Sequence, residues 1–304
     1  MKLGITVIYF AKKREGWMIR VHLTFIRKNT NVPYKIYAGT ERLLPEFRKK
    51  LDGDDIIVCP LSPTNEIAGK ENSFYLEQLF RYAIQDGCTH IAVFHVDSFP
   101  VRPDWVNYLL NKLDEGYQLA AIERCEELDY KPHSSFMFFS TGYYVKYHPS
   151  LRLSEEERKE KSYRKYLKAY PHIPDTGSGF GYQLFKDNLS WYRMQRSNTR
   201  QDHRLFAGIY DDLVFHLGAA GFTMSVTNYD RLRYERRKET FRKILKKFSF
   251  IFPNHNTIVN KIFAEFDQSG YKLRKSNFHN KIKKSIKIRL GADPDLFINS
   301  LRMK

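Results

Sequence analysis

A histidine and an aspartate, His95 and Asp97, follow an apolar run in this sequence. The run His90–Phe94 predicts a buried strand, and residues two apart in an extended chain lie on the same side, so His95 and Asp97 share one side. A carboxylate in this position can hold a divalent cation. The alternative is that Asp97 only caps the turn before a helix near Pro103. We favour the cation because the residue follows an apolar strand.

Asp175 and His216 are further candidates for chemistry. Asp175 stands before a glycine-rich turn that leads into a predicted helix, and a carboxylate fixed at a helix start can take the proton of an attacking hydroxyl. Its alternative role is to cap that helix, which is compatible with a role as proton acceptor. His216 can supply an imidazole to a cation, although a buried structural histidine is nearly as good an interpretation of this residue alone.

The surrounding elements alternate between strand and helix. Apolar runs predict strands, and between them apolar residues recur at helical spacing, most clearly from Glu71 to a stop at Gly87. The expected strands are residues 5–10, 34–38, 56–58, 90–94, 119–122, 136–139 and 191–194, and the expected helices are 17–25, 41–51, 71–87, 103–113 and a charged, solvent-facing one within 154–168. This alternation predicts a mostly parallel sheet with helices on both faces, which binds ligands at the carboxyl ends of its strands.

The candidate segments resemble the motifs of GT-A fold glycosyltransferases, which use nucleotide-sugar donors, and loosely those of the inverting family 2 type. Val93–Trp105 is similar to their Asp-x-Asp strand end, with His95 at the first acidic position and Asp97 at the second. Asp175-Thr176-Gly177, preceded by Pro174, takes the place of the acid-Asp motif, and His216-Leu217-Gly218 that of the C-terminal metal-binding histidine. The resemblance covers residues 3 to about 222.

The resemblance implies a role for each candidate. Asp97 and His216 are expected to bind Mn²⁺ or Mg²⁺, and Asp175 is expected to be the catalytic base of an inverting transfer. The residues expected to bind the nucleotide-sugar donor are Tyr9, Lys70, Asn72, His95 and Asp97. Lys70 and Asn72 follow Gly69 in a stretch that is similar to the family's loop before the metal strand; as a plain helix start, the same stretch needs no ligand.

The choice of base stays open from the sequence. Asp211-Asp212-Leu213 is similar to the family's acid-Asp pattern as well. We favour Asp175 because it precedes a helix and then the strand Trp191–Met194. Inverting and retaining enzymes share this fold, so the stereochemical outcome is open too.

Composition excludes several classes of protein. With 304 residues, 42% hydrophobic and 15% aromatic, the chain is long and apolar enough to bury a core, which excludes whole-chain disorder and coiled-coil or collagen-like structures. Three cysteines without C-x-x-C spacing indicate neither a disulfide framework nor a cysteine zinc site. We expect no signal peptide, and no apolar stretch approaches the about 18 residues that a membrane span requires. The cytoplasm is the expected location.

The positive charge is concentrated at the C-terminus. The chain carries a net charge of +17, and residues 231–304 hold 20 Lys and Arg against 6 Asp and Glu, a net +14. Phe and Ile side chains alternate with Lys and Arg from Phe241 to Phe252, which predicts a basic amphipathic helix that ends near Pro253. This helix either caps the core or brings the protein to an anionic surface, such as the inner face of a membrane.

We therefore expect a GT-A-like α/β catalytic domain over residues 1–228, with an inserted charged helix at 151–170, and a basic helical extension over 229–304. The expected function is metal-dependent transfer of a sugar from a nucleotide-diphosphate donor to a glycan or lipid-linked acceptor. Alternatives are a nucleic-acid-binding protein that uses the basic segment, and a nucleotidyltransferase or hydrolase on a similar fold. We do not expect nucleic acid as a partner, because the charge is segregated from the sheet and no nucleic-acid-binding motif is visible.

Overall fold

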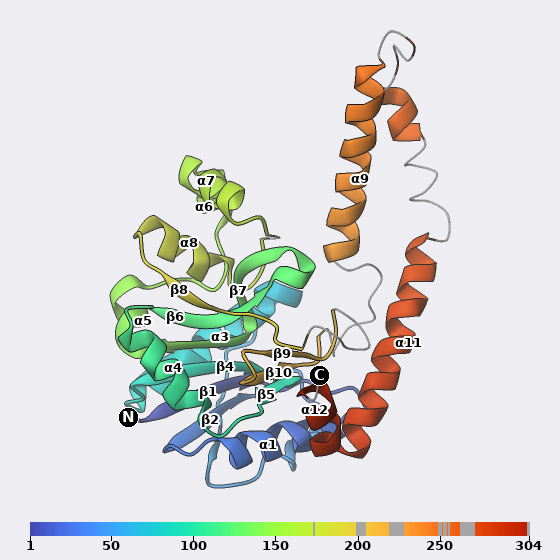
Figure 1. Ribbon diagram of the computed structural model, residues 1–304. Helices are drawn as coiled ribbons and strands as arrows, with labels where there is room; N and C mark the ends of the chain where they lie inside the picture. The colour runs from blue at the N-terminus through green and yellow to red at the C-terminus, as the bar shows by residue number, and fades with distance from the viewer. Residues whose placement is uncertain are drawn as a thin grey trace.

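The structure is a computed structural model that describes residues 1–172, 174–198, 205–218, 228–248, 251, 254, 256–261 and 271–302 (Figure 1). Side chains are described throughout these ranges except at 228–236 and 271–277. No helix among the described residues is both long and apolar enough to span a bilayer.

The central feature is a twisted sheet, to which the described residues contribute seven strands. In sheet order they are β3 (Ile56–Val58), β2 (Tyr34–Gly39), β1 (Leu3–Ile8), β4 (His90–His95), β7 (Asp129–Ser140), β6 (Leu119–Arg124) and β8 (Trp191–Met194). β7 runs antiparallel to both of its neighbours, and the other pairs are parallel. The β1 side chains are buried along the whole strand, as expected for a strand covered on both faces. The carboxyl ends of β1, β4 and β6 therefore meet at one edge.

A second, three-stranded antiparallel sheet lies beside that edge. It joins β5 (Ser98–Pro100), β10 (Val214–His216) and β9 (Gly208–Tyr210) in that order. β5 follows β4 after a two-residue turn, and β10 pairs with it so that His216 lies opposite Ser98. This pairing brings a late segment of the chain next to the end of β4.

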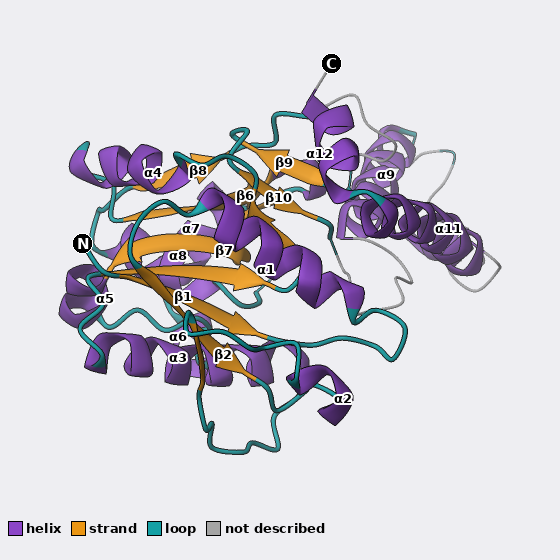
Figure 2. Ribbon diagram, turned by 90° about the horizontal axis from the view of Figure 1, so that it is seen from below, coloured by secondary structure: helices purple, strands orange, loops and turns teal. Residues whose placement is uncertain are grey.

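Helices cover both faces of the main sheet (Figure 2). On one face the buried cluster includes side chains of α1 (Trp17–Asn29), α2 (Pro45–Arg48), α4 (Trp105–Asp114), α11 (Tyr271–Ala292) and α12 (Pro294–Arg302). On the other face it includes side chains of α3 (Ala68–Gln85), α5 (Thr141–Tyr147) and α8 (Ser178–Lys186). This arrangement confirms the predicted fold class, an α/β domain with a mostly parallel sheet and helices on both faces.

The expected elements appear with small differences at their ends. β3 and β8 begin and end where the sequence predicted, and the predicted strand at 136–139 is the last part of the longer β7. The short helix expected over 41–51 is reduced to the single turn of α2, which Pro45 begins.

The charged segment after Ser154 differs from the single solvent-facing helix that we expected. It forms two helices, α6 (Glu155–Lys159) and α7 (Lys161–Ala169), separated at Glu160, whose backbone is extended. Ser154 caps α6 in a capping box with Glu157. Tyr163 and Tyr166 of α7 are buried and pack against Tyr182 of α8. The insertion is thus anchored on α8 by buried aromatic side chains, which the high charge of the segment did not lead us to expect.

The C-terminal extension is helical, as predicted. α9 (Asn228–Lys247) rises away from the sheet, and α11 runs back beside the core to α12 (Figure 1). The predicted basic helix over Phe241–Phe252 is described up to Phe248 and at Ile251, and the rest of it lies outside the described residues. Ile286, Leu290, Phe297 and Ile298 of the extension are buried in the same cluster as β1 and α1.

A substitution at Gly177 tests whether the start of α8 is packed tightly against the backbone of β7. Its φ is +96°, and a Cβ atom there would lie 2.1 Å from the Pro132 carbonyl oxygen of β7. We expect Gly177→Ala to lower the free energy of unfolding by more than about 2 kcal/mol, since strain and a backbone clash add. Gly116→Ala is the matched control, because Gly116 has φ +102° with open space around it; it should cost only about 1 kcal/mol. Equal losses in urea unfolding would contradict the clash.

Candidate active site

Asp97 lies in the turn between β4 and β5, at the carboxyl edge of the main sheet. Only 6% of its side chain is exposed. Its carbonyl oxygen accepts a hydrogen bond of 2.9 Å from the Leu217 amide, which joins this turn to the end of β10. The turn is fixed from within as well, because the Ser98 hydroxyl accepts from the His95 amide. The carboxylate is therefore held on a rigid backbone.

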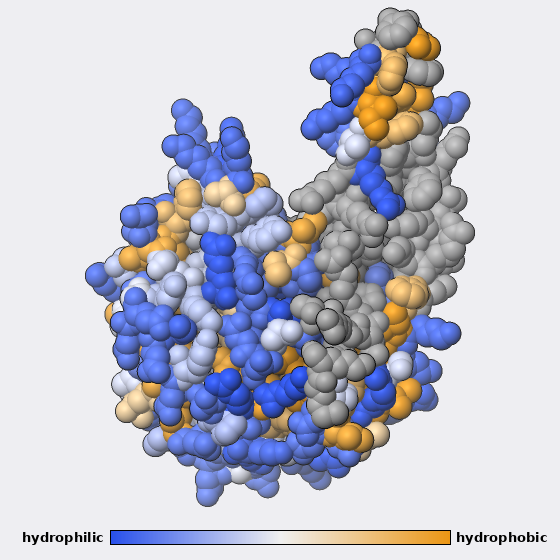
Figure 3. Space-filling model, viewed as in Figure 1, coloured by the Kyte–Doolittle hydropathy of each residue, from blue (hydrophilic) through white to orange (hydrophobic). Residues whose placement is uncertain are grey.

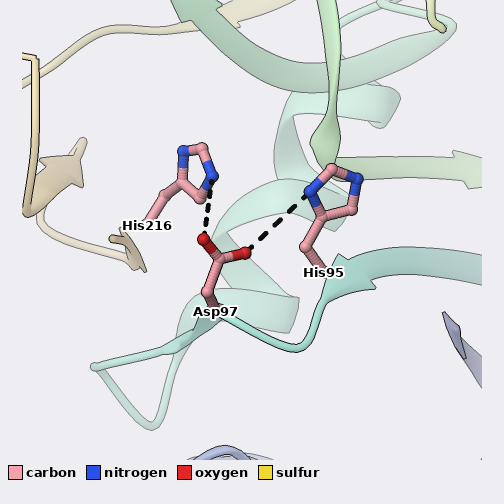
Figure 4. Close-up of side chains that lie close together, drawn as sticks. All are labelled: His95, Asp97 and His216. Atoms are coloured by element: carbon pink, nitrogen blue, oxygen red, sulfur yellow. Dashed lines mark ion pairs between the residues drawn. The ribbon is translucent and has the colours of Figure 1, made fainter. Parts of the chain in front are cut away.

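His216 approaches Asp97 from the small sheet. Its side chain is 3% exposed, and its Nε2 lies 3.7 Å from Oδ2 of Asp97 (Figure 4). His95 approaches from the end of β4, with Nδ1 4.0 Å from Oδ1 of Asp97. The ring of His95 is oriented by Ser134 of β7, whose hydroxyl lies 3.3 Å from Nε2. One carboxylate thus lies between two imidazoles that come from different sheets.

The three side chains fit a single metal ion. One nitrogen of each imidazole and one carboxylate oxygen all lie within 4.8 Å of one another. Two ligands that are each about 2.1 Å from one ion can be at most about 4.2 Å apart. The His216 nitrogen is 3.7 Å from one Asp97 oxygen and the His95 nitrogen is 4.0 Å from the other, so the two imidazoles flank the carboxylate at distances that a shared ion could bridge after side-chain rotation. Mixed nitrogen and oxygen ligands suit Mn²⁺, Fe²⁺ or Zn²⁺ better than Mg²⁺, which takes oxygen ligands and water.

Burial keeps both imidazoles neutral. It lowers the pKa of His216 to about 3 and lowers the pKa of His95, while the nearby Asp97 carboxylate opposes both shifts. Metal binding requires a neutral imidazole with a free lone pair. The structure places His95 among the possible metal ligands, and its expected role in binding the nucleotide stays a prediction.

His133 is a third histidine at this site, and the sequence analysis did not identify it. Its ring lies 5.6 Å from that of His216 and 6.2 Å from that of His95, measured between ring centroids. Its Nδ1 accepts the Ser135 amide hydrogen, so the proton of the neutral ring is on Nε2. His133 therefore offers a hydrogen-bond donor rather than a metal-binding lone pair. No local motif marks it, because it lies in the middle of a long strand.

Asp175 precedes α8 and lies beside the start of α3. Its Oδ1 accepts the Thr176 amide hydrogen at 2.8 Å and lies 3.4 Å from Nη1 of Arg152, and 57% of the side chain is exposed. The Thr176 hydroxyl donates to the Gly69 carbonyl, which fixes α8 against α3. Burial lowers the pKa of His95, and the negative charge of Asp175, like that of Asp97, opposes this shift.

The other predicted donor-binding residues lie in different surroundings. Lys70 is 53% exposed and forms a surface ion pair with Glu66, and Asn72 is half-buried on the first turns of α3. Tyr9 is fully buried, and its hydroxyl lies 3.2 Å from Nδ1 of His22. This position gives Tyr9 a packing role after β1. The binding roles of all three residues stay predictions.

The rival base motif forms a turn. Asp211 and Asp212 both have positive φ and connect β9 to β10, at the end of the hairpin opposite His216. Asp211 accepts from the Gln195 amide, and Asp212 accepts from the Ser197 hydroxyl. Aspartate tolerates this left-handed backbone and hydrogen-bonds locally in turns. Both residues therefore have a structural explanation here.

Comparisons with known proteins find structural neighbours but no sequence relatives. No family model matches the sequence, and no curated protein matches it either. A mannosyltransferase from Pyrobaculum calidifontis in complex with GDP-Man and Mn²⁺ superposes with a TM-score of 0.40 and 11% identity, over 66% of this chain and 58% of that one. Mouse xyloside xylosyltransferase 1 gives 0.38 and 8%, over 64% and 85%. CMP:2-keto-3-deoxy-manno-octonic acid synthetase in complex with CTP gives 0.39 and 12%, over 64% and 90%.

Asp97→Asn tests the metal site. We expect the wild-type chain to bind Mn²⁺ at least about tenfold more tightly than Mg²⁺, and Asp97→Asn to weaken Mn²⁺ binding by at least the same factor, because an amide is a poorer ligand than a carboxylate. Titration calorimetry measures the affinities for Mn²⁺ and Mg²⁺, and electron paramagnetic resonance measures the bound fraction of Mn²⁺. Asp104→Asn is the control: it removes an exposed carboxylate seven residues later and should leave the Mn²⁺ affinity unchanged. Unchanged Mn²⁺ affinity in Asp97→Asn would reject the site.

Proposed function

We propose that this protein is a metal-dependent glycosyltransferase that moves a sugar from a nucleotide-diphosphate donor to a glycan or lipid-linked acceptor, with inversion. The observation that supports it most is the triad of His95, Asp97 and His216 at the carboxyl edge of a mostly parallel sheet. In such sheets this edge is where ligands bind. A cation bound to the triad would neutralise the charge that develops on the departing diphosphate.

Asp175 is the proposed base. It accepts the proton of the acceptor hydroxyl while that oxygen forms a bond to the anomeric carbon, and the bond from this carbon to the diphosphate breaks with its electron pair going to phosphate. Two features support the choice: the Asp175 carboxylate is exposed and anchored by the Thr176 amide, and its charge reaches His95. Asp211 and Asp212, in contrast, are engaged in a turn.

Donor turnover tests this function. The protein is incubated with Mn²⁺ and a panel of UDP- and GDP-sugars. We expect slow release of nucleoside diphosphate as the sugar is transferred to water, which serves as the first acceptor tested. Asp175→Asn should lower this rate by about 100-fold or more with donor affinity little changed, because it removes the proton acceptor and keeps the shape. Asp187→Asn, at the other end of α8, is the control.

Three other results would redirect the assignment. An active Asp175→Asn with an inactive Asp211→Asn or Asp212→Asn would move the base to the β9–β10 turn. Release of pyrophosphate from a nucleoside triphosphate and a sugar phosphate would indicate nucleotidyl transfer instead. Retention of the donor's anomeric configuration in the product, followed by NMR, would contradict inversion.

We also propose that the end of α9 attaches reversibly to an anionic bilayer. Ile244, Phe248 and Ile251 are about half exposed, and hydrophobic residues gather at the upper end of this arm beside hydrophilic ones (Figure 3). Lys243, Lys246 and Lys247 are exposed around them. Each basic residue near an anionic surface contributes at most about 1 kcal/mol, and apolar burial adds to it.

Vesicle co-sedimentation tests this attachment. The wild-type chain should pellet with vesicles that contain phosphatidylserine and not with neutral ones, and high salt should weaken pelleting because it screens the charges. Lys246→Glu with Lys247→Glu should abolish it, whereas Lys165→Glu with Lys168→Glu, on exposed sites of α7, should not. Equal pelleting with both lipids, or with neither, would contradict the proposal.

A further inference from the structure

The helix α11, in the C-terminal extension, packs against the side of the molecule that carries the triad. Its last turns fix its position: Ile286 and Leu290 are buried, and a Cβ atom on Gly291 would lie 3.3 Å from the Trp17 ring. Lys287 forms an ion pair of 2.6 Å with Glu15, in the loop that follows β1. The register of α11 on the core is therefore set by contacts of both apolar and charged side chains.

One and two turns earlier, α11 buries two polar side chains. Lys283 is 7% exposed and His279 is 2% exposed. The His279 ring lies 6.0 Å from the Phe206 ring. The next residue, Ala207, donates its amide hydrogen to the Leu217 carbonyl, directly after His216. This part of α11 therefore covers the chain segment that presents His216.

Lys283 lies on α11 between two contacts with the edge of the molecule that carries the triad. One turn later, Lys287 pairs with Glu15 in the loop after β1, and one turn earlier, His279 lies beside Phe206, next to the segment that carries His216. Burial, together with Lys287 and Lys12, lowers the pKa of Lys283 to about 8 against the opposing effects of Glu15 and Asp97. Among lysines with described side chains, only Lys131 is comparably buried, and it pairs with Asp129. Burying an ammonium group costs free energy that a nearby anion offsets.

We infer that Lys283 binds a phosphate oxygen of the diphosphate held at the triad, so that the C-terminal extension completes the active site. This inference rests on the proposed function for the identity of the ligand. It assigns part of the extension's positive charge to the site itself. The exposed lysines of α9 remain available for the bilayer, because they lie on a different helix.

Pyrophosphate binding in the presence of Mn²⁺ tests Lys283 without any nucleotide or sugar. Calorimetry on the full chain should show that Lys283→Met weakens pyrophosphate binding by about tenfold or more, because a charge-assisted hydrogen bond is lost. Lys283→Arg should retain most of the affinity. Lys284→Met, on the exposed face of the same helix, should bind as wild type does. Binding of Mn²⁺ alone should not weaken in Lys283→Met, since a cation has been removed from near the metal site.

Several results would overturn the inference. The first is equal pyrophosphate affinity in Lys283→Met and Lys284→Met, and the second is no pyrophosphate binding by the wild-type chain. The third is weaker binding of Mn²⁺ alone to Lys283→Met, because that result would give Lys283 a role in shaping the triad. If Lys283→Met does not fold, Lys283→Gln takes its place: loss with Gln and retention with Arg supports the inference, and equal affinity overturns it.

Turnover separates this inference from the proposed function. Wild-type turnover of UDP- or GDP-sugars by Lys283→Met, with unchanged pyrophosphate affinity, rejects the role of Lys283 and leaves the function standing. Lys283-dependent pyrophosphate binding by a chain that turns over no nucleotide sugar rejects the function and retains the anion site.

Discussion

The burial of the Asp97 carboxylate is the constraint on which the rest of the site depends. Removing this charge from water costs free energy, and the two imidazoles beside it supply lone pairs rather than positive charge because burial keeps them neutral. A buried carboxylate with a neutral imidazole near each of its oxygens is suited to a cation. The fold builds this group through one short antiparallel contact, in which β10 pairs with β5 and carries His216 to the end of β4.

A second group of buried charges holds that contact in place. Arg124, at the end of β6, pairs with Glu127 and donates to the Leu205 carbonyl, just before β9. The Tyr210 hydroxyl of β9 donates to Glu126 in the β6–β7 connection. The small sheet is thus tied to the main sheet by buried polar bonds, and losing one partner of such a pair typically costs about 3–5 kcal/mol. The positive charge of Arg124 also lowers the pKa values of His95 and His216, which helps to keep both rings neutral.

The C-terminal extension combines two kinds of surface in one basic segment. Along α11 and α12, apolar side chains such as Ile286 and Phe297 enter the core beside α1, and charged residues such as Lys284 and Arg289 are exposed, whereas Lys283 is buried. On α9 and directly after it, the apolar side chains of Ile244 and Phe248 are exposed beside lysines. Composition does not predict which apolar side chains are buried, because both segments mix Lys and Arg with Phe and Ile. Whether an apolar side chain is buried or exposed depends on which helix packs against the core.

The sequence by itself determined the layered α/β fold, most of its elements and the position of Asp97 at the end of a buried strand. These features follow from local periodicity, which sets whether a segment buries one face or two. The tertiary structure alone decided that His95 joins the triad, that His133 lies beside it, that Asp211 and Asp212 form a turn, and that α7 is anchored by buried tyrosines. Each of these depends on contacts between segments far apart in the chain, such as Ser98 with His216. Periodicity carries no information about which distant segment will supply the partner.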